Sequence, residues 1–201
     1  MFFLAGCALG LVLGLVAGGS FKTLAQVQFR WPLVVVAALV IKDAAFITSL
    51  ATFPLTGLIY VVSLIALLAW TVWHWERLPL IWLVSVGIAM NAMVVVANGG
   101  HMTVSVELAK KSAASVQPLV RLGTYGQYTL EGPNTHLNWL GDWIALPGPI
   151  HSIFPQVYSP GDLVMFAGMV LMVFLATRPR LLDRFRRPLQ IADRHPQRPG
   201  V

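Results

Sequence analysis

Charged residues are scarce in this sequence. Only 11% of the 201 residues are Asp, Glu, Lys or Arg, whereas soluble domains carry about 25%. Hydrophobic residues make up 57% of the chain, and they form runs that approach the roughly 20 residues needed to cross a bilayer as a helix. The shortage of charge excludes a soluble enzyme and a disordered tail protein, and it predicts an integral membrane protein.

Cysteine is almost absent, because Cys7 is the only one in the chain. A single cysteine excludes an internal disulfide. The order Leu4-Ala5-Gly6-Cys7 is like that of a lipoprotein processing site, but a signal peptide needs a basic and then an apolar segment before its cleavage site. Only three uncharged residues precede this box, so we expect no lipidation.

Closely spaced metal ligands are missing as well, since the chain has neither His-Glu-x-x-His nor Cys-x-x-Cys. Three histidines do fall between residues 98 and 160, together with Glu131 and Asp142, and Asp162 follows directly after this stretch. Histidine and carboxylate ligands suit a metal ion, but no spacing supports a site. The sequence therefore predicts no metal and names no cofactor. The weak candidate ligands are His101, His136 and His151.

The net charge of +6 raises the question of nucleic acid, and the placement of the basic residues answers it. Half of the Lys and Arg residues follow the last apolar run, as cytoplasmic flanks of membrane proteins do. We therefore expect no nucleic-acid partner, and a tail that meets the lipid bilayer and its anionic head groups. These residues are Arg178, Arg180, Arg184, Arg186, Arg187, Arg194 and Arg198.

Five apolar runs predict an all-α bundle of five transmembrane helices in a single domain, 1–177, followed by a basic tail, 178–201. Two of the runs open with proline, which the first turn of a helix tolerates. A long stretch, 98–160, separates the fourth run from the fifth. The predicted spans are 1–17, 32–52, 55–73, 79–97 and 162–177.

The charge count predicts the orientation of these spans. Lys22, Arg30, Arg77 and the seven tail arginines put ten basic residues on one side, against three on the other. The more basic side of a bacterial membrane protein is cytoplasmic. We therefore expect a multi-pass protein of the cytoplasmic membrane with an external N-terminus and a cytoplasmic tail. The loop 98–160 is then extracytoplasmic, and it is apolar enough to lie on the membrane surface and roof the bundle.

Four glycines in the first span recur every fourth residue and so share one helical face. Such small-residue faces let a second backbone approach closely in lipid. This face fits either a neighbouring helix of the same chain or a partner, which is another membrane subunit or a second copy. The second reading suggests a non-catalytic accessory subunit. The glycines are Gly6, Gly10, Gly14 and Gly18.

Two charged residues, Lys42 and Asp43, lie inside the second span. A charge at the middle of a bilayer costs about 2.5–3.5 kcal/mol, so each must face protein or water. We expect one of them to bond Asn91, Ser63 or an inward loop residue as polar glue between helices. The alternative is an ion or lipid path, as in a small transporter or lipid-handling protein.

Three short motifs lie in and around the long loop: Asn-Gly-Gly-x-Met-x-Val-Ser from Asn98, Gly-Asp-x-Ile-x-x-Pro from Gly141, and Ser-x-Gly-Asp from Ser159. With the glycine-rich first span, they resemble a bacterial multi-pass family catalogued only as domain of unknown function 5317. The resemblance covers most of the chain, with Thr103 in place of an expected proline. It implies a membrane protein and no particular activity.

Asp142 and Asp162 lie 20 positions apart on one side of the membrane. With the segments that follow them, they resemble the second half of signal peptidase II, which implies an interfacial hydrolase with these residues as its catalytic dyad and Asn98 as an orienting amide. Paired carboxylates suit this chemistry because one acts as base while the other acts as acid. Alternatively, Asp162 caps its helix and Asp142 closes a turn.

Overall fold

The computed structural model describes residues 2–27, 30–47, 55–111, 117–148 and 156–178, and this part of the chain is mostly helical. Its five long helices coincide with the five apolar runs, with bounds close to those expected; the end of the second run, 48–52, lies outside the described residues. They are α1 (Phe2–Val16), α3 (Pro32–Ile47), α4 (Thr56–Trp73), α5 (Ile81–Ala97) and α9 (Pro160–Ala176).

Local sequence explains where two of these helices begin. Pro32 opens α3 at a position where its missing N–H group costs nothing. Ser159 precedes α9 and its hydroxyl accepts a hydrogen bond from the backbone N–H of Asp162, while the Asp162 side chain accepts one from the backbone N–H of Ser159. This reciprocal capping box fixes the first turn of α9.

Within the described residues, α4 is the one helix long and apolar enough to cross a membrane. The apolar parts of the other four long helices are each 10–17 residues long. They are Phe3–Val16, Pro32–Ile41, Ile81–Ala97 and Pro160–Ala176.

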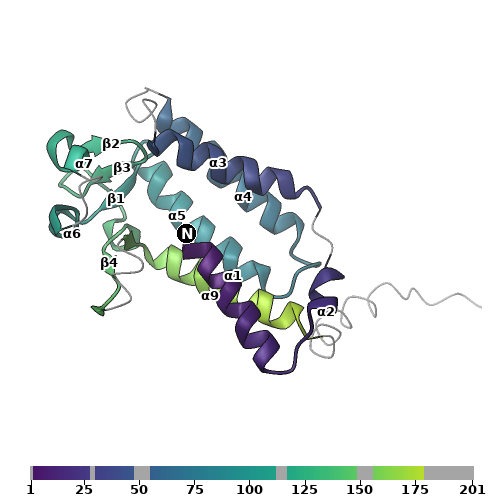
Figure 1. Ribbon diagram of the computed structural model, residues 1–201. Coiled ribbons are helices and arrows are strands. Elements are labelled where there is room, and N and C mark those ends of the chain that lie inside the picture. The colour runs from purple at the N-terminus through teal and green to yellow at the C-terminus, as the bar shows by residue number, and fades with distance from the viewer. Residues whose placement is uncertain (1, 28–29, 48–54, 112–116, 149–155, 179–201) are drawn as a thin grey trace, which may run out of the picture.

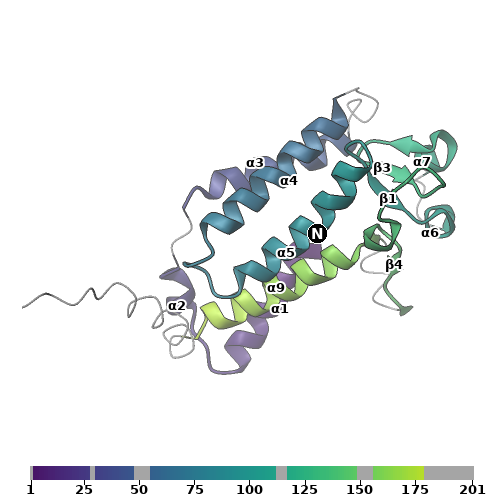
Figure 2. The same ribbon diagram turned by 180° about the vertical axis from the view of Figure 1, so that it is seen from behind.

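The long helices pack in a chain of neighbours (Figures 1 and 2). Helix α9 contacts both α1 and α5, and α4 contacts both α3 and α5. Helices α3 and α4 form one pair, and α1 and α9 form another. Helix α5 joins the two pairs, because it contacts both α4 and α9. Buried apolar side chains of α4, α5 and α9, including Leu64, Ile88 and Met165, form the core.

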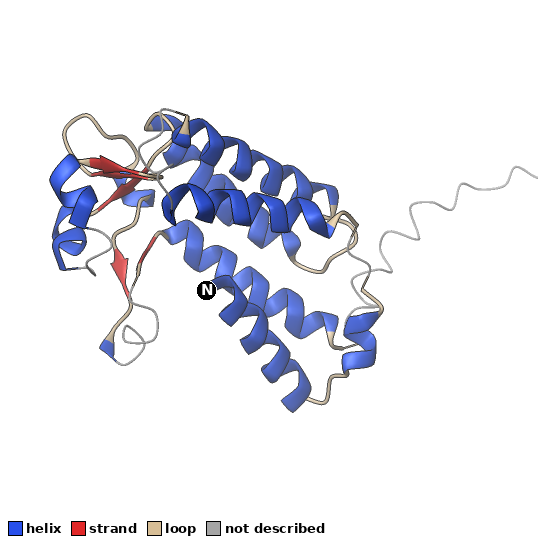
Figure 3. Cartoon of the chain, turned by 45° about the horizontal axis from the view of Figure 1, so that its top comes forward, coloured by secondary structure: helices blue, strands red, loops and turns tan. Residues whose placement is uncertain are grey.

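The segment between α5 and α9 was expected to be a long loop of an all-α fold, and the structure instead contains two small sheets there (Figure 3). In the first, β1 (Met102–Val104) pairs in parallel with β3 (Tyr128–Leu130), which pairs antiparallel with β2 (Thr124–Tyr125). In the second, β4 (Ile144–Ala145) pairs with β5 (Val157–Tyr158). Strands of two or three residues are too short to show an alternating pattern, so no sequence periodicity predicts them. The remaining elements here are α6 (Val106–Lys111), α7 (Gln117–Leu122) and the short 3-10 helix η3 (Asn138–Leu140).

These elements between α5 and α9, which we call the β layer, lie at one end of the helical bundle (Figure 1). A short helix, α2 (Phe21–Ala25), lies at the opposite end, where the backbone N–H of Ser20 donates to the carbonyl of Thr177 at the end of α9. The β layer therefore covers the end of the bundle opposite to the one from which the arginine-rich tail leaves.

The glycine face of α1 packs against α9 of the same chain. A Cβ atom at Gly6 would press on the Phe166 ring, one at Gly10 would collide with the carbonyl oxygen of Val170, and one at Gly14 with the side chain of Thr177. Gly18 differs, since it has a φ of +83° and no such neighbour. At Gly6, Gly10 and Gly14 the glycine face is therefore covered by the same chain, and it is not available there for docking of a partner subunit.

Close contact at Gly10 leads to a stability prediction. We expect Gly10→Ile to lower the free energy of unfolding by about 1–3 kcal/mol, the cost of overpacking, because its side chain would meet the backbone of α9. Thermal unfolding of the purified protein measures the effect. Ala8→Ile is the matched control, since Ala8 is an exposed position of the same helix. Equal losses in the two variants would contradict this packing.

Candidate active site

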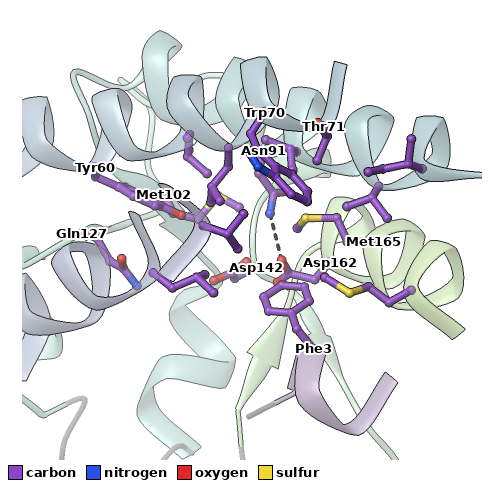
Figure 4. A pocket seen from close by; sticks show the side chains of 18 of the residues that line it. Phe3, Tyr60, Trp70, Thr71, Asn91, Met102, Gln127, Asp142, Asp162 and Met165 are labelled. Carbon is purple, nitrogen blue, oxygen red and sulfur yellow. Dashed lines mark hydrogen bonds between the residues drawn. The ribbon is translucent and has the colours of Figure 1, made fainter. Parts of the chain in front are cut away.

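A cavity of about 140 Å³ lies between the long helices and the β layer (Figure 4). Its walls are mainly apolar and come from α3, α4, α5 and α9, with Phe3 of α1 at one side. The β layer contributes Met102, Gln127, Tyr128 and Asp142. Because this space joins five helices to the β layer, it is where side chains far apart in the sequence meet.

Asp162 lies at the start of α9 and is held by a buried network. Its Oδ1 accepts a hydrogen bond of 2.8 Å from Nδ2 of Asn91 on α5, and its Oδ2 accepts one of 3.2 Å from the backbone N–H of Ser159. The hydroxyl of Ser159 donates to Oδ1 of Asn91 at 2.9 Å. The Asn91 side chain and the Ser159 backbone thus hold the carboxylate in one orientation, and the Ser159 hydroxyl in turn holds the Asn91 amide.

Small residues make this network possible. A Cβ atom at Gly161 would collide with Oδ1 of Asn91, and one at Gly87 would collide with the carbonyl oxygen of Gly161. The two glycines therefore let α5 and α9 approach closely enough for the Asn91 amide to reach the Asp162 carboxylate.

Asp142 is positioned by the β layer. Its backbone N–H donates to the carbonyl of Thr103 at 2.8 Å, and its own carbonyl accepts from the N–H of Ser105 at 3.0 Å. The preceding residue must be small, because a Cβ atom at Gly141 would collide with Thr103. Asp142 is only 6% exposed, so this backbone pairing buries its side chain at the end of the bundle.

The structure brings Asp142 and Asp162 to the same cavity. Both residues line it, and in Figure 4 both carboxylates point into the same part of the space. Asp162 also takes part in the capping box of α9, so for this residue the capping role and the cavity position coexist. The backbone groups of Asp142, and not its side chain, pair with Thr103 and Ser105. The side chain of Asp142 therefore points into the cavity (Figure 4).

Asn98 occupies a different place from the one expected of an orienting amide. Its Nδ2 donates to the carbonyls of Val94 and His136, and its Oδ1 accepts from the backbone N–H of His136. Asn98 thus ties the end of α5 to the β layer. The amide that contacts a cavity carboxylate is that of Asn91.

The sequence model of a family of unknown function matches residues 26–174. The chain belongs to this family, DUF5317. The matched segment contains every residue that lines the cavity except Phe3. No curated protein and no solved structure matches the chain. The family carries no assigned activity, so the geometry of the cavity has to supply the functional argument.

Gln127 is a cavity residue of this DUF5317 chain that the sequence analysis did not single out. It is only 5% exposed, and its Oε1 atom has no hydrogen-bond partner in the described part of the chain. It follows Gly126, which has a φ of +59°, in the turn between β2 and β3. The Tyr-Gly-Gln-Tyr sequence indicates a turn, but only the packing of the β layer directs that turn at the bundle.

The remaining candidate residues do not gather into a metal centre. Among the described residues there is no cluster of three His, Cys, Asp or Glu side chains that could hold an ion. His136 is exposed, and Glu131 accepts a hydrogen bond from the backbone N–H of Val106. His151, the side chains of Lys42 and Asp43, and the tail beyond Arg178 lie outside the described part of the chain.

Tyr158 lies directly before the capping box of α9, and its surroundings raise the pKa of its phenol. Burial is the larger cause, and the negative charge of Asp162 is the second. Since the pKa of a tyrosine in an unfolded chain is about 10, the contribution of Tyr158 to stability is complete below that pH. It is lost as the pH rises through the pKa of the folded protein.

We therefore expect Asp162→Asn to lower the pKa of Tyr158 towards its ordinary value, because the substitution removes the nearby negative charge. Tyrosinate absorbance during an alkaline titration measures this change, with Tyr158→Phe identifying the signal. Glu107→Gln, which removes a charge on α6 whose partner is Lys111, is the control. An unchanged titration in Asp162→Asn would contradict the assigned charge effect.

Proposed function

We propose that this protein is a polytopic membrane hydrolase whose active site is the cavity between the helices. The observation that carries the proposal is that Asp142 and Asp162 line one cavity although they come from different parts of the fold. Two carboxylates that face one space are the minimum equipment for acid–base hydrolysis without a covalent intermediate.

In the proposed reaction, one carboxylate takes a proton from a water molecule as the water oxygen attacks a carbonyl carbon of the substrate. The other carboxyl group gives a proton to the leaving oxygen or nitrogen as its bond to carbon breaks. Asn91 and Ser159 keep the carboxylate of Asp162 in a fixed orientation, and a fixed orientation lowers the entropic cost of reaching the transition state. The apolar walls limit the entry of bulk water.

Membrane insertion is part of the proposal, and the surface of the bundle supports it. The long helices expose large apolar side chains, including Leu4 at 74%, Val16 at 83% and Leu33 at 78%. Water-soluble monomers rarely expose contiguous apolar surface of this kind. Five spans with an extracytoplasmic β layer agree with the alternating course of the helices, since α9 ends at the opposite end of the bundle.

The test of the catalytic proposal uses the purified full chain in lipid nanodiscs. The probes are a fluorogenic ester and a fluorogenic amide, each carrying one alkyl chain. We expect hydrolysis of at least one probe by the wild-type protein and none above background by the double variant Asp142→Asn/Asp162→Asn. Equal rates for the wild type and the double variant would contradict the proposal.

The orientation is tested separately with reporters. A reporter fused after Arg187 is expected to read cytoplasmic, and one inserted near Gly126 is expected to read extracytoplasmic, because the basic flanks stay on the cytoplasmic side. Alkaline phosphatase and green fluorescent protein fusions at the two sites give opposite readouts and control for each other. The reverse pattern would overturn the charge-based orientation.

A further inference from the structure

A buried acceptor in the cavity points to the class of the substrate, and this inference rests on the proposed function. We propose that the substrate is a fatty acyl amide whose N–H group donates to Oε1 of Gln127. Its carbonyl group lies at Asp142 and Asp162, and its acyl chain follows the helices away from the β layer.

Gln127 offers an acceptor that the protein itself leaves unused. Its Oε1 atom has no hydrogen-bond partner in the described part of the chain, and the residue is only 5% exposed. A buried polar atom without a partner lowers stability, and native proteins keep few of them. Because Gln127 lines the cavity, a donor on a bound ligand would satisfy this atom.

The backbone around Gln127 is fixed by the first sheet of the β layer. Its carbonyl accepts a hydrogen bond of 2.7 Å from the backbone N–H of Met102, and the next residue, Tyr128, pairs with Met102 in that sheet. Gly126, with a φ of +59°, makes the turn that precedes it. A side chain on a fixed backbone can bind a substrate group at a small cost in entropy.

An amide matches both this acceptor and the proposed chemistry. Gln127, Asp142 and Asp162 all belong to the end of the cavity next to the β layer (Figure 4). In an amide the carbonyl carbon and the nitrogen are bonded neighbours, so the carbon can face the carboxyl groups and a water molecule while the N–H points to Gln127. An ester has no hydrogen at the corresponding oxygen and would leave Oε1 unsatisfied. A site that bonds a substrate N–H discriminates against the analogue that lacks it.

The reaction on an amide balances with the groups present. The water oxygen forms a bond to the carbonyl carbon and gives a proton to one carboxylate, and the bond between that carbon and the nitrogen breaks. The nitrogen keeps the hydrogen that it donates to Gln127 and gains a second one from the other carboxyl group. The products are a fatty acid and an amine.

The rest of the cavity suits one acyl chain, because it is elongated along the bundle and apolar away from the β layer. On α4 its lining runs from Tyr60 to Thr71, a separation of about 16 Å along the helix. On α9 the lining includes Met165, Met169 and Met172. Methionine side chains are unbranched and flexible, so they adapt to the shape of a bound chain.

Binding is tested with two probes that have no carbonyl group to be attacked. They are N-methyl and N,N-dimethyl dodecanesulfonamide, each with a bromine at the end of the chain, and the second lacks the N–H. The bromine is expected to quench Trp70, which lines the end of the cavity far from the β layer. We expect saturable quenching in nanodiscs, with a half-saturation concentration at least about tenfold lower for the N-methyl probe. The second methyl group by itself favours burial, so equal or tighter binding of the dimethyl probe would overturn the proposal.

Two tryptophan variants locate the acyl chain. Trp70→Phe is expected to remove the saturable quenching. Trp73→Phe is the matched control and is expected to keep it, since Trp73 is an exposed residue of the same helix. Saturable quenching that persists in Trp70→Phe would overturn the proposal. The comparison of the two probes in the wild-type protein stands even if Trp70→Phe does not fold.

Variants of Gln127 identify the acceptor. Gln127→Leu is expected to abolish the preference for the N-methyl probe, whereas Gln127→Glu keeps an oxygen acceptor and is expected to keep the preference. Gln26→Leu is the matched control, because Gln26 is exposed at the end of α2, on the opposite end of the bundle. A preference that survives in Gln127→Leu, or one that is lost in Gln127→Glu, would overturn the proposal.

Turnover gives a second readout with the fluorogenic amide and ester. The ratio of kcat/KM for the amide to kcat/KM for the ester is expected to fall by at least about tenfold in Gln127→Leu. An unchanged ratio would contradict the role of Gln127. The two proposals fail separately. A preference for the N–H probe without turnover of any substrate removes the hydrolase function, whereas turnover without that preference removes the amide class.

Discussion

Replacing either Asp142 or Asp162 by Asn is expected to slow hydrolysis of the fluorogenic probes by about 10²–10⁴-fold, the usual contribution of a general acid or base. Asn has the shape of Asp but neither accepts nor releases the proton that the reaction moves. At position 162, Asn also keeps an oxygen that can accept the backbone N–H of Ser159, so α9 is expected to keep its cap. Initial rates at saturating probe measure the effect.

Two comparisons separate a catalytic loss from a structural one. Glu107→Gln removes a carboxylate outside the cavity and is expected to keep the wild-type rate. Since the two carboxylates act as a unit, the double variant should be no slower than the slower single variant. A single Asn variant with the wild-type rate would exclude that residue from catalysis.

The largest loss of stability is expected from Asn91→Leu, at about 2–4 kcal/mol in the free energy of unfolding. The amide of Asn91 bonds both the carboxylate of Asp162 and the hydroxyl of Ser159, and it is 4% exposed. Leucine leaves the buried hydroxyl of Ser159 and the partly buried carboxylate of Asp162 without this bond. A buried group left unsatisfied costs about 1–3 kcal/mol, more when it is charged. Chemical or thermal unfolding measures the loss.

Ser85→Ala is the matched control on the same helix, because the hydroxyl of Ser85 bonds the carbonyl of Ile81 one turn earlier in its own helix. We expect it to cost less than about 1 kcal/mol. A double-mutant cycle between Asn91→Leu and Asp162→Asn should give a coupling energy of about 0.5–3 kcal/mol, as contacting residues do. Additive losses would mean that the two side chains do not stabilise each other.

Parts of the site were predictable from the sequence. Asp142 and Asp162 were candidates because they flank the start of the last predicted span and resemble the aspartates of signal peptidase II, and Asn91 was a candidate as a polar residue in an apolar run. Their relation did not follow from the sequence, because the spacing of 20 residues contains two strands that turn the chain back on itself. The resemblance to signal peptidase II implies Asn98 as the orienting amide, whereas the close approach of Gly87 and Gly161 brings the amide of Asn91 to the Asp162 carboxylate.

The glycine face of α1 was likewise predictable from the sequence only in part. A repeat every four residues predicts a close helix contact, and it does so by geometry alone. Whether the contact is within one chain or between chains depends on which helix lies opposite. The carbonyl of Val170 and the side chain of Thr177 occupy that position, and no feature of the first 20 residues could have named α9.

The sequence by itself determined the five long helices, because runs of apolar residues bounded by proline and polar turns have one stable arrangement in an apolar environment. Only the tertiary structure decided the β layer, the position of Gln127 and the shared cavity of Asp142 and Asp162. Pairing of short strands is a long-range contact, as between β1 and β3, and its energy comes from partners that no local pattern specifies.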